Sequence, residues 1–216
     1  MQKSSVLKLF GLFLALFLPI LGSWIYIKDY YNRFITNLAF ELGAHYYDLR
    51  IVDSTTKDGS LVFHIKNSLP MRDIAGKSHD FELEAAIDME AVTFNVPMTL
   101  ALLLAIILTA GIPFRKKREI VFKGVLFLFL LHIGSMLLFS LCTIAEIAQT
   151  NPYIHFYLSR HYLAGEALCA LKDFLINYAA RFEPFLIALY AWFEIHRQKI
   201  SERAADRPPS TPKSPA

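Results

Sequence analysis

The sequence is poor in charged residues and has few cysteines. Lys, Arg, Asp and Glu make up 19% of its 216 residues, and the formal net charge is +3. Soluble domains carry more charge than this, and proteins that bind nucleic acid carry a larger positive excess. We therefore expect neither a soluble domain nor a nucleic-acid partner. Cys142 and Cys169 lie in apolar helical patterns, indicate no disulfide framework, and are expected to pack as small hydrophobic residues.

The sequence also lacks the short motifs that mark common catalytic and binding sites. It has no glycine-rich loop for a phosphate, no Cys-x-x-Cys pair and no Gly-x-Ser-x-Gly elbow. Its histidines are scattered, and the spacing of His155 and His161 is not usual for metal ligands. A solvated acidic surface accounts for the carboxylates of residues 29–90. We therefore expect no cofactor, no metal site and no catalytic residue, and hence a protein that is not an enzyme.

Long apolar runs are what the sequence has in abundance. Hydrophobic residues make up 55% of the chain, its mean hydropathy is +0.38, and it contains 18 Phe and 10 Tyr. A membrane-spanning helix needs about 20 apolar residues. Four segments approach this length: residues 9–27, 96–113, 124–148 and about 166–197. The first could instead be a cleaved signal peptide, but the poor cleavage site at residues 21–23 favours an uncleaved anchor.

A basic stretch between the second and third runs predicts the orientation. Residues 114–123 contain five basic residues and one acidic residue, whereas residues 28–96 contain seven basic and eleven acidic residues, a local charge of −4. Lys and Arg are retained on the cytoplasmic side of a membrane. Three basic groups then share that side: Lys3 and Lys8, residues 115–118, and Arg197, Lys199 and Arg203. We therefore expect a multi-pass membrane protein, with both termini cytoplasmic and the lipid bilayer as a partner.

The segment between the first two runs predicts a small α+β domain. Tyr30, Phe34, Leu38 and Leu42 recur at four-residue spacing, which predicts an amphipathic helix over residues 28–44. Its apolar face should lie on the membrane surface or cover the strands that follow. Strands are predicted at residues 47–53, 60–66 and 80–88, with an Asp-Gly turn signal at the end of residues 54–59 and a loop at residues 67–78.

The predicted fold class is therefore an α-helical integral membrane protein with four transmembrane helices and a small extracytoplasmic α+β domain between helices 1 and 2. The predicted divisions are residues 1–27 (N-terminus and helix 1), 28–95 (periplasmic domain), 96–200 (helices 2–4, with a basic cytoplasmic loop at 114–123) and 201–216 (disordered tail). A domain as small as the periplasmic unit is marginal alone, so we expect it to lean on the membrane or on a partner.

Polar residues form a stripe on each of the last two predicted helices. The stripes are His132, Ser135, Phe139, Cys142, Glu146 and Gln149 on the third run, and Glu166, Cys169, Asp173, Asn177 and Arg181 on the fourth. Because charged groups at membrane depth are costly, they face protein or water rather than lipid. We therefore take His132, Ser135, Cys142, Glu146, Asp173, Asn177 and Arg181 as candidate interhelical or partner contacts. Helix rise allows Glu146 to pair with Lys172 or Arg181.

Two other functions are open to these residues. Cys142 or Cys169 could be the nucleophile of an intramembrane cysteine hydrolase, although no third group stands at a recognisable catalytic spacing. Glu146 and Arg181 could serve a small transporter or channel subunit, although four spans are few for a transporter unless it oligomerises. Interhelical packing or partner contact is the interpretation that the residues favour.

Three features of the chain together resemble a known family. An N-terminal anchor precedes a short extracytoplasmic α+β segment, the second run begins Asn95-Val-Pro-Met-Thr-Leu-Ala-Leu-Leu-Leu-Ala105, and residues 185–192 follow Pro184 and precede a basic exit. In these features the chain resembles the small exosortase-associated membrane proteins of Gram-negative bacteria. The resemblance implies a non-catalytic accessory or scaffold subunit in the bacterial inner membrane. Its partner would be a larger membrane protein such as an exosortase, which sorts and cleaves proteins bearing a C-terminal signal.

Overall fold

The computed structural model describes residues 3–57, 59–68, 71–72, 78–88, 93–150 and 165–205. Its helices are α1 (Lys3–Tyr46), α2 (Val96–Thr109), α3 (Phe114–Thr150), α5 (Gly165–Phe174) and α6 (Ala180–Ala205), with a π-helical turn η2 (Leu175–Ala179) between α5 and α6. Its strands are β1 (Leu49–Lys57), β2 (Ser60–Asn67), β3 (Met71–Arg72), β4 (Ser78–His79) and β5 (Glu82–Asp88).

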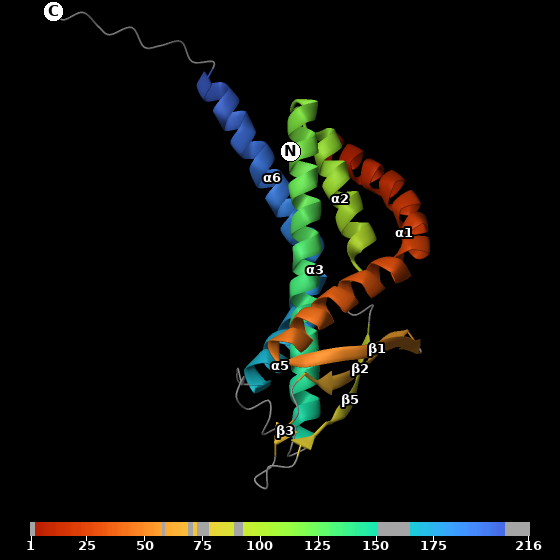
Figure 1. Ribbon diagram of the computed structural model, residues 1–216. Coiled ribbons are helices and arrows are strands. Elements are labelled where there is room, and N and C mark those ends of the chain that lie inside the picture. The colour runs from red at the N-terminus through yellow and green to blue at the C-terminus, as the bar shows by residue number, and fades with distance from the viewer. Residues whose placement is uncertain are drawn as a thin grey trace, which may run out of the picture.

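Helix α3 is the axis around which the other elements gather (Figure 1). Helices α2 and α6 run beside its first half, and the sheet of β1, β2 and β5 lies beside its second half. Helix α1 begins beside α2, bows away from it, and returns to cross α3 just above the sheet. Gly124 permits the close approach of α2 and α3, because a Cβ at this position would lie 3.0 Å from a methyl carbon of Leu103.

Two of the described helices are long and apolar enough to cross a membrane, namely α1 from Val6 and α3. Helix α2 is strongly apolar but has only 14 residues. The protein is thus mostly helical, with two candidate spanning helices and a small sheet, and the expectation of four transmembrane helices is not supported. Of the predicted fourth run, only α6 is long enough for this test, and it is too charged to pass, since Arg181, Glu183, Glu194 and Arg197 lie within its first 18 residues.

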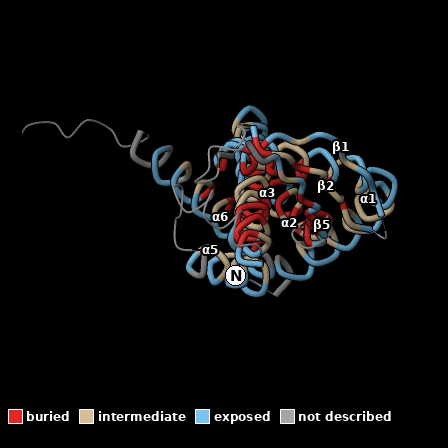
Figure 2. Tube along the Cα trace, turned by 60° about the horizontal axis from the view of Figure 1, so that its bottom comes forward, coloured by how far each residue is buried: buried red, intermediate tan, exposed pale blue. Residues whose placement is uncertain are grey.

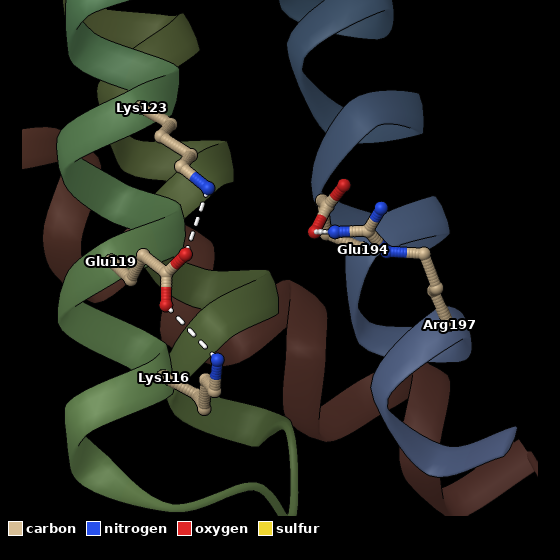
Figure 3. A network of polar contacts seen from close by, with 5 residues as sticks. All are labelled: Lys116, Glu119, Lys123, Glu194 and Arg197. Carbon is tan, nitrogen blue, oxygen red and sulfur yellow. Dashed lines mark hydrogen bonds and ion pairs between the residues drawn. The ribbon is translucent and has the colours of Figure 1, made fainter. Parts of the chain in front are cut away.

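The basic stretch at residues 114–123 is helical, so the loop conformation predicted for it is wrong. The connection between α2 and α3 is confined to residues 110–113, and α3 already begins at Phe114. Glu119 stabilises this first part of α3, because its carboxylate accepts hydrogen bonds from Lys116 at 3.2 Å and from Lys123 at 2.7 Å (Figure 3). A second ion pair, Glu194 with Arg197 at 3.0 Å, lies on the neighbouring helix α6.

The predicted small sheet is confirmed, with an antiparallel order β1-β2-β5. Strand β1 continues through Lys57, beyond the predicted boundary, so only two residues connect it to β2. Gly59 adopts a positive φ of 80°, as a two-residue hairpin turn requires. The register shifts between Ile51 and Asp53, which bulges β1 at its outer edge.

One face of the sheet is buried against α1 and α3, and the other face is open. The buried residues alternate with half-buried residues along β2 and with exposed residues along β5, as a sheet with one buried face requires. The inward residues are Leu61, Phe63, Ile65, Leu83, Ala85 and Ile87. The rings of Phe40 on α1 and Phe63 on β2 stack with centroids 3.9 Å apart, and Figure 2 shows the buried residues gathered along α3, α2 and the sheet.

The second half of α1 covers the strands with a face other than the predicted one. Ile35, Ala39 and Phe40 are fully buried against the sheet and α3. Tyr30 and Phe34, from the predicted apolar row, remain 79% and 56% exposed. The four-residue spacing correctly marks an apolar row, but this row flanks the buried face rather than forming it.

Two smaller boundaries also differ from the sequence-based expectations. Residues 67–78, predicted as a loop, contain the short paired strands β3 and β4. Helix α6 continues to Ala205 and therefore includes the first residues of the predicted disordered tail, while residues 206–216 lie outside the described part of the chain.

Candidate functional site

A carboxylate from α6 is buried inside the helical bundle. Glu183 is 1% exposed, although no charge would be expected there from its apolar neighbours. It lies on the buried face of α6, whose other members are Pro184, Ile187, Ala191 and Ile195. Glu183 and the last three apolar residues recur at four-residue spacing, so they line the same side of the helix. Glu183 therefore lies at the N-terminal end of an apolar row that faces the interior of the bundle.

Glu183 is held by side chains from three other helices. Its Oε2 lies 2.8 Å from Nε2 of His132 on α3, and its Oε1 accepts a hydrogen bond of 2.8 Å from the Thr99 hydroxyl on α2. The hydroxyl of Tyr31 on α1 lies 2.8 Å from Nδ1 of His132. His132 and Thr99 are fully buried, and Tyr31 is half-buried. We call Tyr31, Thr99, His132 and Glu183 the four-helix network.

The network lies deep in the apolar part of the bundle. At about 1.5 Å per residue, His132 is about 20 Å along α3 from Glu119, and Glu183 is about 16 Å along α6 from Glu194. Two independent helices thus give similar heights above the charged end shown in Figure 3. In a hydrocarbon core of about 30 Å, such a site lies beyond the midplane.

Each polar atom facing inward in the network has a partner. The Thr99 hydroxyl lies 2.8 Å from Oε1 of Glu183 and 3.0 Å from the carbonyl oxygen of Asn95, which also accepts from the Thr99 backbone N–H at 2.9 Å. The hydroxyl has one proton, and the carboxylate, at the shorter distance, is the stronger acceptor for it. Buried charges are stable only when they are paired and hydrogen-bonded. The hydrogen bonds from Thr99 and His132 therefore explain how the bundle tolerates the buried carboxylate of Glu183.

The heavy-atom geometry accommodates two proton counts. With neutral His132, the Tyr31 hydroxyl donates to Nδ1 and Nε2–H donates to an anionic Glu183. With one more proton, both ring nitrogens donate, to the Tyr31 oxygen and to Glu183, and the pair is a buried salt bridge. Either assignment of donors and acceptors keeps the hydrogen bonds from Tyr31 to His132 and from His132 to Glu183 intact.

A second polar hydrogen bond joins α1 to the start of α2. The Thr93 hydroxyl donates to Oδ1 of Asn32 at 2.6 Å, and both residues are buried. The buried hydroxyl of Thr36, one turn further along α1, has no hydrogen-bond partner among the described residues. Polar contacts therefore join α1 to the bundle at two adjacent residues, Tyr31 and Asn32.

The two cysteines form a disulfide, which corrects the expectation that they pack as separate small hydrophobic residues. Cys142 on α3 bonds to Cys169 on α5, with Cα atoms 5.1 Å apart. The pairing arises because α5 folds back along the second half of α3, and the 27-residue sequence separation hides this proximity. A disulfide leaves neither sulfur as a free thiolate, which opposes the cysteine hydrolase interpretation.

Charged side chains surround the disulfide. The Lys172 ammonium lies 3.6 Å from Glu146 and 3.5 Å from Asp173, and stands 5.5 Å from the centre of the Phe139 ring. Of the two partners that helix rise allows for Glu146, the structure thus selects Lys172. The sulfur atoms and Glu146 lie close enough to hold a cation, but the disulfide and the adjacent ammonium do not fit one.

The remaining candidate residues divide between the interior and the surface. Ser135 is buried one turn from His132 on α3. Asn177 and Arg181 are exposed and do not meet the α3 stripe. The π-helical turn η2 changes the residues per turn between α5 and α6, so the predicted stripe of the fourth run does not continue along one face. The side chain of Glu166 lies outside the described residues.

Three members of the network were not among the predicted site residues. Tyr31, Thr99 and Glu183 lie on separate segments, and their convergence depends on the packing of four helices. One signal was present for Glu183, because it starts the four-residue row of Ile187, Ala191 and Ile195. A carboxylate in register with an apolar row favours a buried and paired position.

The outer face of the sheet carries a different set of charges. His64 on β2 lies 3.4 Å from Glu84 on β5, and both side chains are substantially exposed. Lys66 forms an ion pair with Glu82 at the next inter-strand position. The hydrogen bond from Lys66, together with its charge, lowers the pKa of the Glu82 carboxyl below its ordinary value. A shallow hollow of about 220 Å³ beside these pairs is lined in part by Val52 and Asp53.

No protein-family model, curated protein or solved structure matches the chain. The resemblance to exosortase-associated proteins therefore stays a hypothesis that rests on the residues quoted for it.

Proposed function

We propose that the chain is a non-catalytic accessory or scaffold subunit of a membrane-embedded protein processing or sorting system. The observation that carries the proposal is the closed four-helix network. Its buried polar atoms already bond to one another, so the site has no free nucleophile or open ligand position to offer a substrate. An arrangement of this kind stabilises one packing of helices.

The proposed topology has four helices across a bacterial inner membrane and both termini in the cytoplasm. Support comes from the two opposite ends of α3. One end carries Lys116 and Lys123, which the positive-inside rule assigns to the cytoplasm. Toward the other end, the Cys142–Cys169 disulfide suits an oxidising compartment such as the periplasm. The sheet, beside the disulfide end, is then extracytoplasmic.

The proposed partner surface is the outer face of α6. It presents a dense set of large, exposed apolar side chains: Phe182, Phe185, Leu186, Leu189, Trp192 and Phe193. Phe and Trp are over-represented where membrane and protein interfaces are made. By the resemblance described above, the partner is a larger membrane protein such as an exosortase.

Photo-crosslinking in native membranes tests this proposal. A photoreactive amino acid would replace Phe185 or Trp192 on α6, and Phe122 on the exposed side of α3 would be the matched control position. We expect one larger membrane protein to be crosslinked from α6, and to co-purify with the tagged chain after mild detergent extraction. Crosslinks to lipid only from all three positions, with recovery of a monomer, would count against an accessory role.

A second candidate function is a proton-coupled transporter or channel subunit. The observation that favours it is a histidine–glutamate pair buried deep in the helical bundle, a combination of side chains that is typical of proton relays in pumps and transporters. Reconstitution into liposomes that contain a pH-sensitive dye separates the two functions. Proton flux that is lost in Glu183→Gln, with the oligomeric state unchanged, would favour the transporter, and the absence of flux from the intact chain would favour the scaffold.

A further inference from the structure

We infer that Arg115 and Arg118, at the charged end of α3, bind the phosphate of an anionic phospholipid whose acyl chain lies along Phe122 and Leu126. We call these four residues the headgroup face. This inference rests on the proposed membrane topology, in which α3 spans the bilayer, and is independent of the accessory role.

The four consecutive cations near the start of α3 divide into two pairs. The Lys116 ammonium donates to Glu119 at 3.2 Å, and the Lys117 ammonium donates at 3.2 Å to a carbonyl oxygen near the end of α2. Arg115 and Arg118 are exposed, and neither side chain has a hydrogen-bond or ion-pair partner within the described part of the chain. The two guanidinium groups are therefore free to bind a ligand from outside the protein.

Helical spacing also separates the arginines from the ion pairs of α3. Figure 3 shows Lys116, Glu119 and Lys123 on the side of α3 next to α6. The residues of the headgroup face follow one another at intervals of three, four and four residues, so they share a side of the helix. Because each residue turns an α-helix by about 100°, the mean directions of the two groups differ by about 90°. The headgroup face is thus a separate surface of α3.

The part of the headgroup face that follows the arginines is apolar and open. Phe122 and Leu126 are 68% and 44% exposed, whereas Ile120 and Leu128, on the opposite side of α3, are buried against α2 and α6. Large apolar side chains in a spanning helix are suited to hydrocarbon and not to water. Along this side of α3, cations are therefore followed by an apolar surface, which is the order of groups that a phospholipid presents from phosphate to acyl chain.

Distances along α3 match the layers of a bilayer. By helix rise, Arg118 and Arg115 lie about 6 Å and about 10 Å from Phe122. The headgroup layer on each side of the hydrocarbon core is about 5–8 Å thick, and aromatic rings are enriched at its inner boundary. With the Phe122 ring at this boundary, Arg118 lies within the headgroup layer and Arg115 lies at its outer limit. Both guanidinium groups can then reach a phosphate, because long basic side chains bend toward the headgroups.

The chemistry of the two arginines selects an anionic headgroup. A guanidinium group forms two parallel hydrogen bonds with a phosphate, which an ammonium group does not. Basic residues beside a spanning helix attract lipids with a net negative charge. A zwitterionic lipid such as phosphatidylcholine brings its own cation next to the phosphate, so it complements the arginine pair less well. The ligand is therefore an anionic phospholipid, for which phosphatidylglycerol is the probe.

Native mass spectrometry of the full chain in mild detergent tests this inference. It measures the affinity for phosphatidylglycerol and for phosphatidylcholine with the same acyl chains. The double variant Arg115→Gln/Arg118→Gln removes two charges from the headgroup face. The matched control Lys116→Gln/Lys117→Gln removes the same charge from the adjacent positions, whose side chains bond within the protein. None of the four side chains is buried, and an unchanged thermal unfolding midpoint verifies the fold of each variant.

We expect the native chain to prefer phosphatidylglycerol, and the arginine variant to lose about fivefold in this affinity for each arginine removed. The lysine variant should lose no more than about twofold, and the affinity for phosphatidylcholine should change in neither. Equal losses in the two double variants would overturn the inference, because the basic stretch would then attract lipid by its total charge. Equal affinity of the native chain for the two lipids would overturn it as well. Since no partner protein is present, neither result bears on the accessory role, which the crosslinking of α6 tests separately.

Discussion

Among the residues that the structure describes, two histidine–glutamate pairs lie in opposite surroundings. His132 and Glu183 join α3 to α6 at 2.8 Å, and their side chains are 0% and 1% exposed. His64 and Glu84 join two strands at 3.4 Å, and their side chains are 42% and 71% exposed. The same chemistry is thus present inside the bundle and on the open face of the sheet.

The difference shows that surroundings decide what such a pair does. Solvent screens the exposed pair, so its net contribution to stability is small and either partner can be lost. The buried pair has no water to replace a missing partner, so each group depends on the other. We therefore expect the bundle to be sensitive to single polar substitutions that the sheet tolerates.

The largest expected effect is that of Glu183→Ala. It leaves the Thr99 hydroxyl and His132 without their acceptor, and breaking a buried pair costs about 3–5 kcal/mol. Glu84→Ala is the matched control, for which we expect about 0.2–1 kcal/mol. Thermal unfolding in detergent micelles measures both. Equal costs for the two substitutions would remove the distinction between the pairs.

The next effect concerns the covalent link at the disulfide end of the molecule. Cys142→Ala and Cys169→Ala each open the same loop, whose ends are 27 residues apart in the sequence, and loop entropy predicts a loss of about 3.5 kcal/mol. The two variants, and the double variant, should therefore lose similar stability. A catalytic cysteine would instead show itself as loss of function from one substitution only, at normal protein abundance.

Smaller effects are expected at the two hydroxyl groups of the network. Tyr31→Phe and Thr99→Val each remove one interhelical hydrogen bond while they retain most of the side-chain volume. Such bonds contribute on average about 0.6 kcal/mol in membrane proteins, with a maximum near 1.7. The denaturant dependence of unfolding measures these costs. Losses of unfolding free energy as large as that for Glu183→Ala would contradict this expectation, because each hydroxyl group would then stabilise the Glu183 carboxylate as much as His132 does.

The smallest effect concerns the pH dependence of the sheet. Lys66 lowers the pKa of Glu82, so the carboxylate stabilises the folded state above its ordinary pKa of 4.5, and this contribution is lost as the pH falls below that value. Lys66→Met should remove this part of the acid sensitivity. Because Glu82 is fully exposed, the change is best detected as the difference between the two unfolding curves across pH 3–6. Identical curves would show that the pair contributes nothing measurable.

Periodicity predicted the elements of this protein better than their boundaries. The alternation in residues 60–66 and 80–88 placed two of the three main strands, because one buried face repeats every two residues. Charge composition misled at residues 114–123, where Lys and Arg suggested a loop, although they are also good helix formers. The irregular turn η2 had no sequence signal of its own, so the fourth run was predicted as one straight helix.

The residues of the candidate site could be predicted only where several of them share one face of a single helix. His132, Ser135 and Cys142 were found because they share one face of α3. Glu183 and Tyr31 reach His132 from distant segments, and only the packing of four helices brings them within hydrogen-bond distance. The Cys142–Cys169 bond escaped prediction for the same reason.

A double-mutant cycle on His132→Ala and Glu183→Ala tests most directly whether the buried pair locks the bundle. Unfolding free energies of the four proteins in one detergent give the coupling energy, and the cycle on His64→Ala and Glu84→Ala supplies the exposed reference. We predict a coupling of about 1.5–3 kcal/mol for the buried pair and less than about 0.5 kcal/mol for the exposed one. Additive losses at His132 and Glu183 would contradict the account.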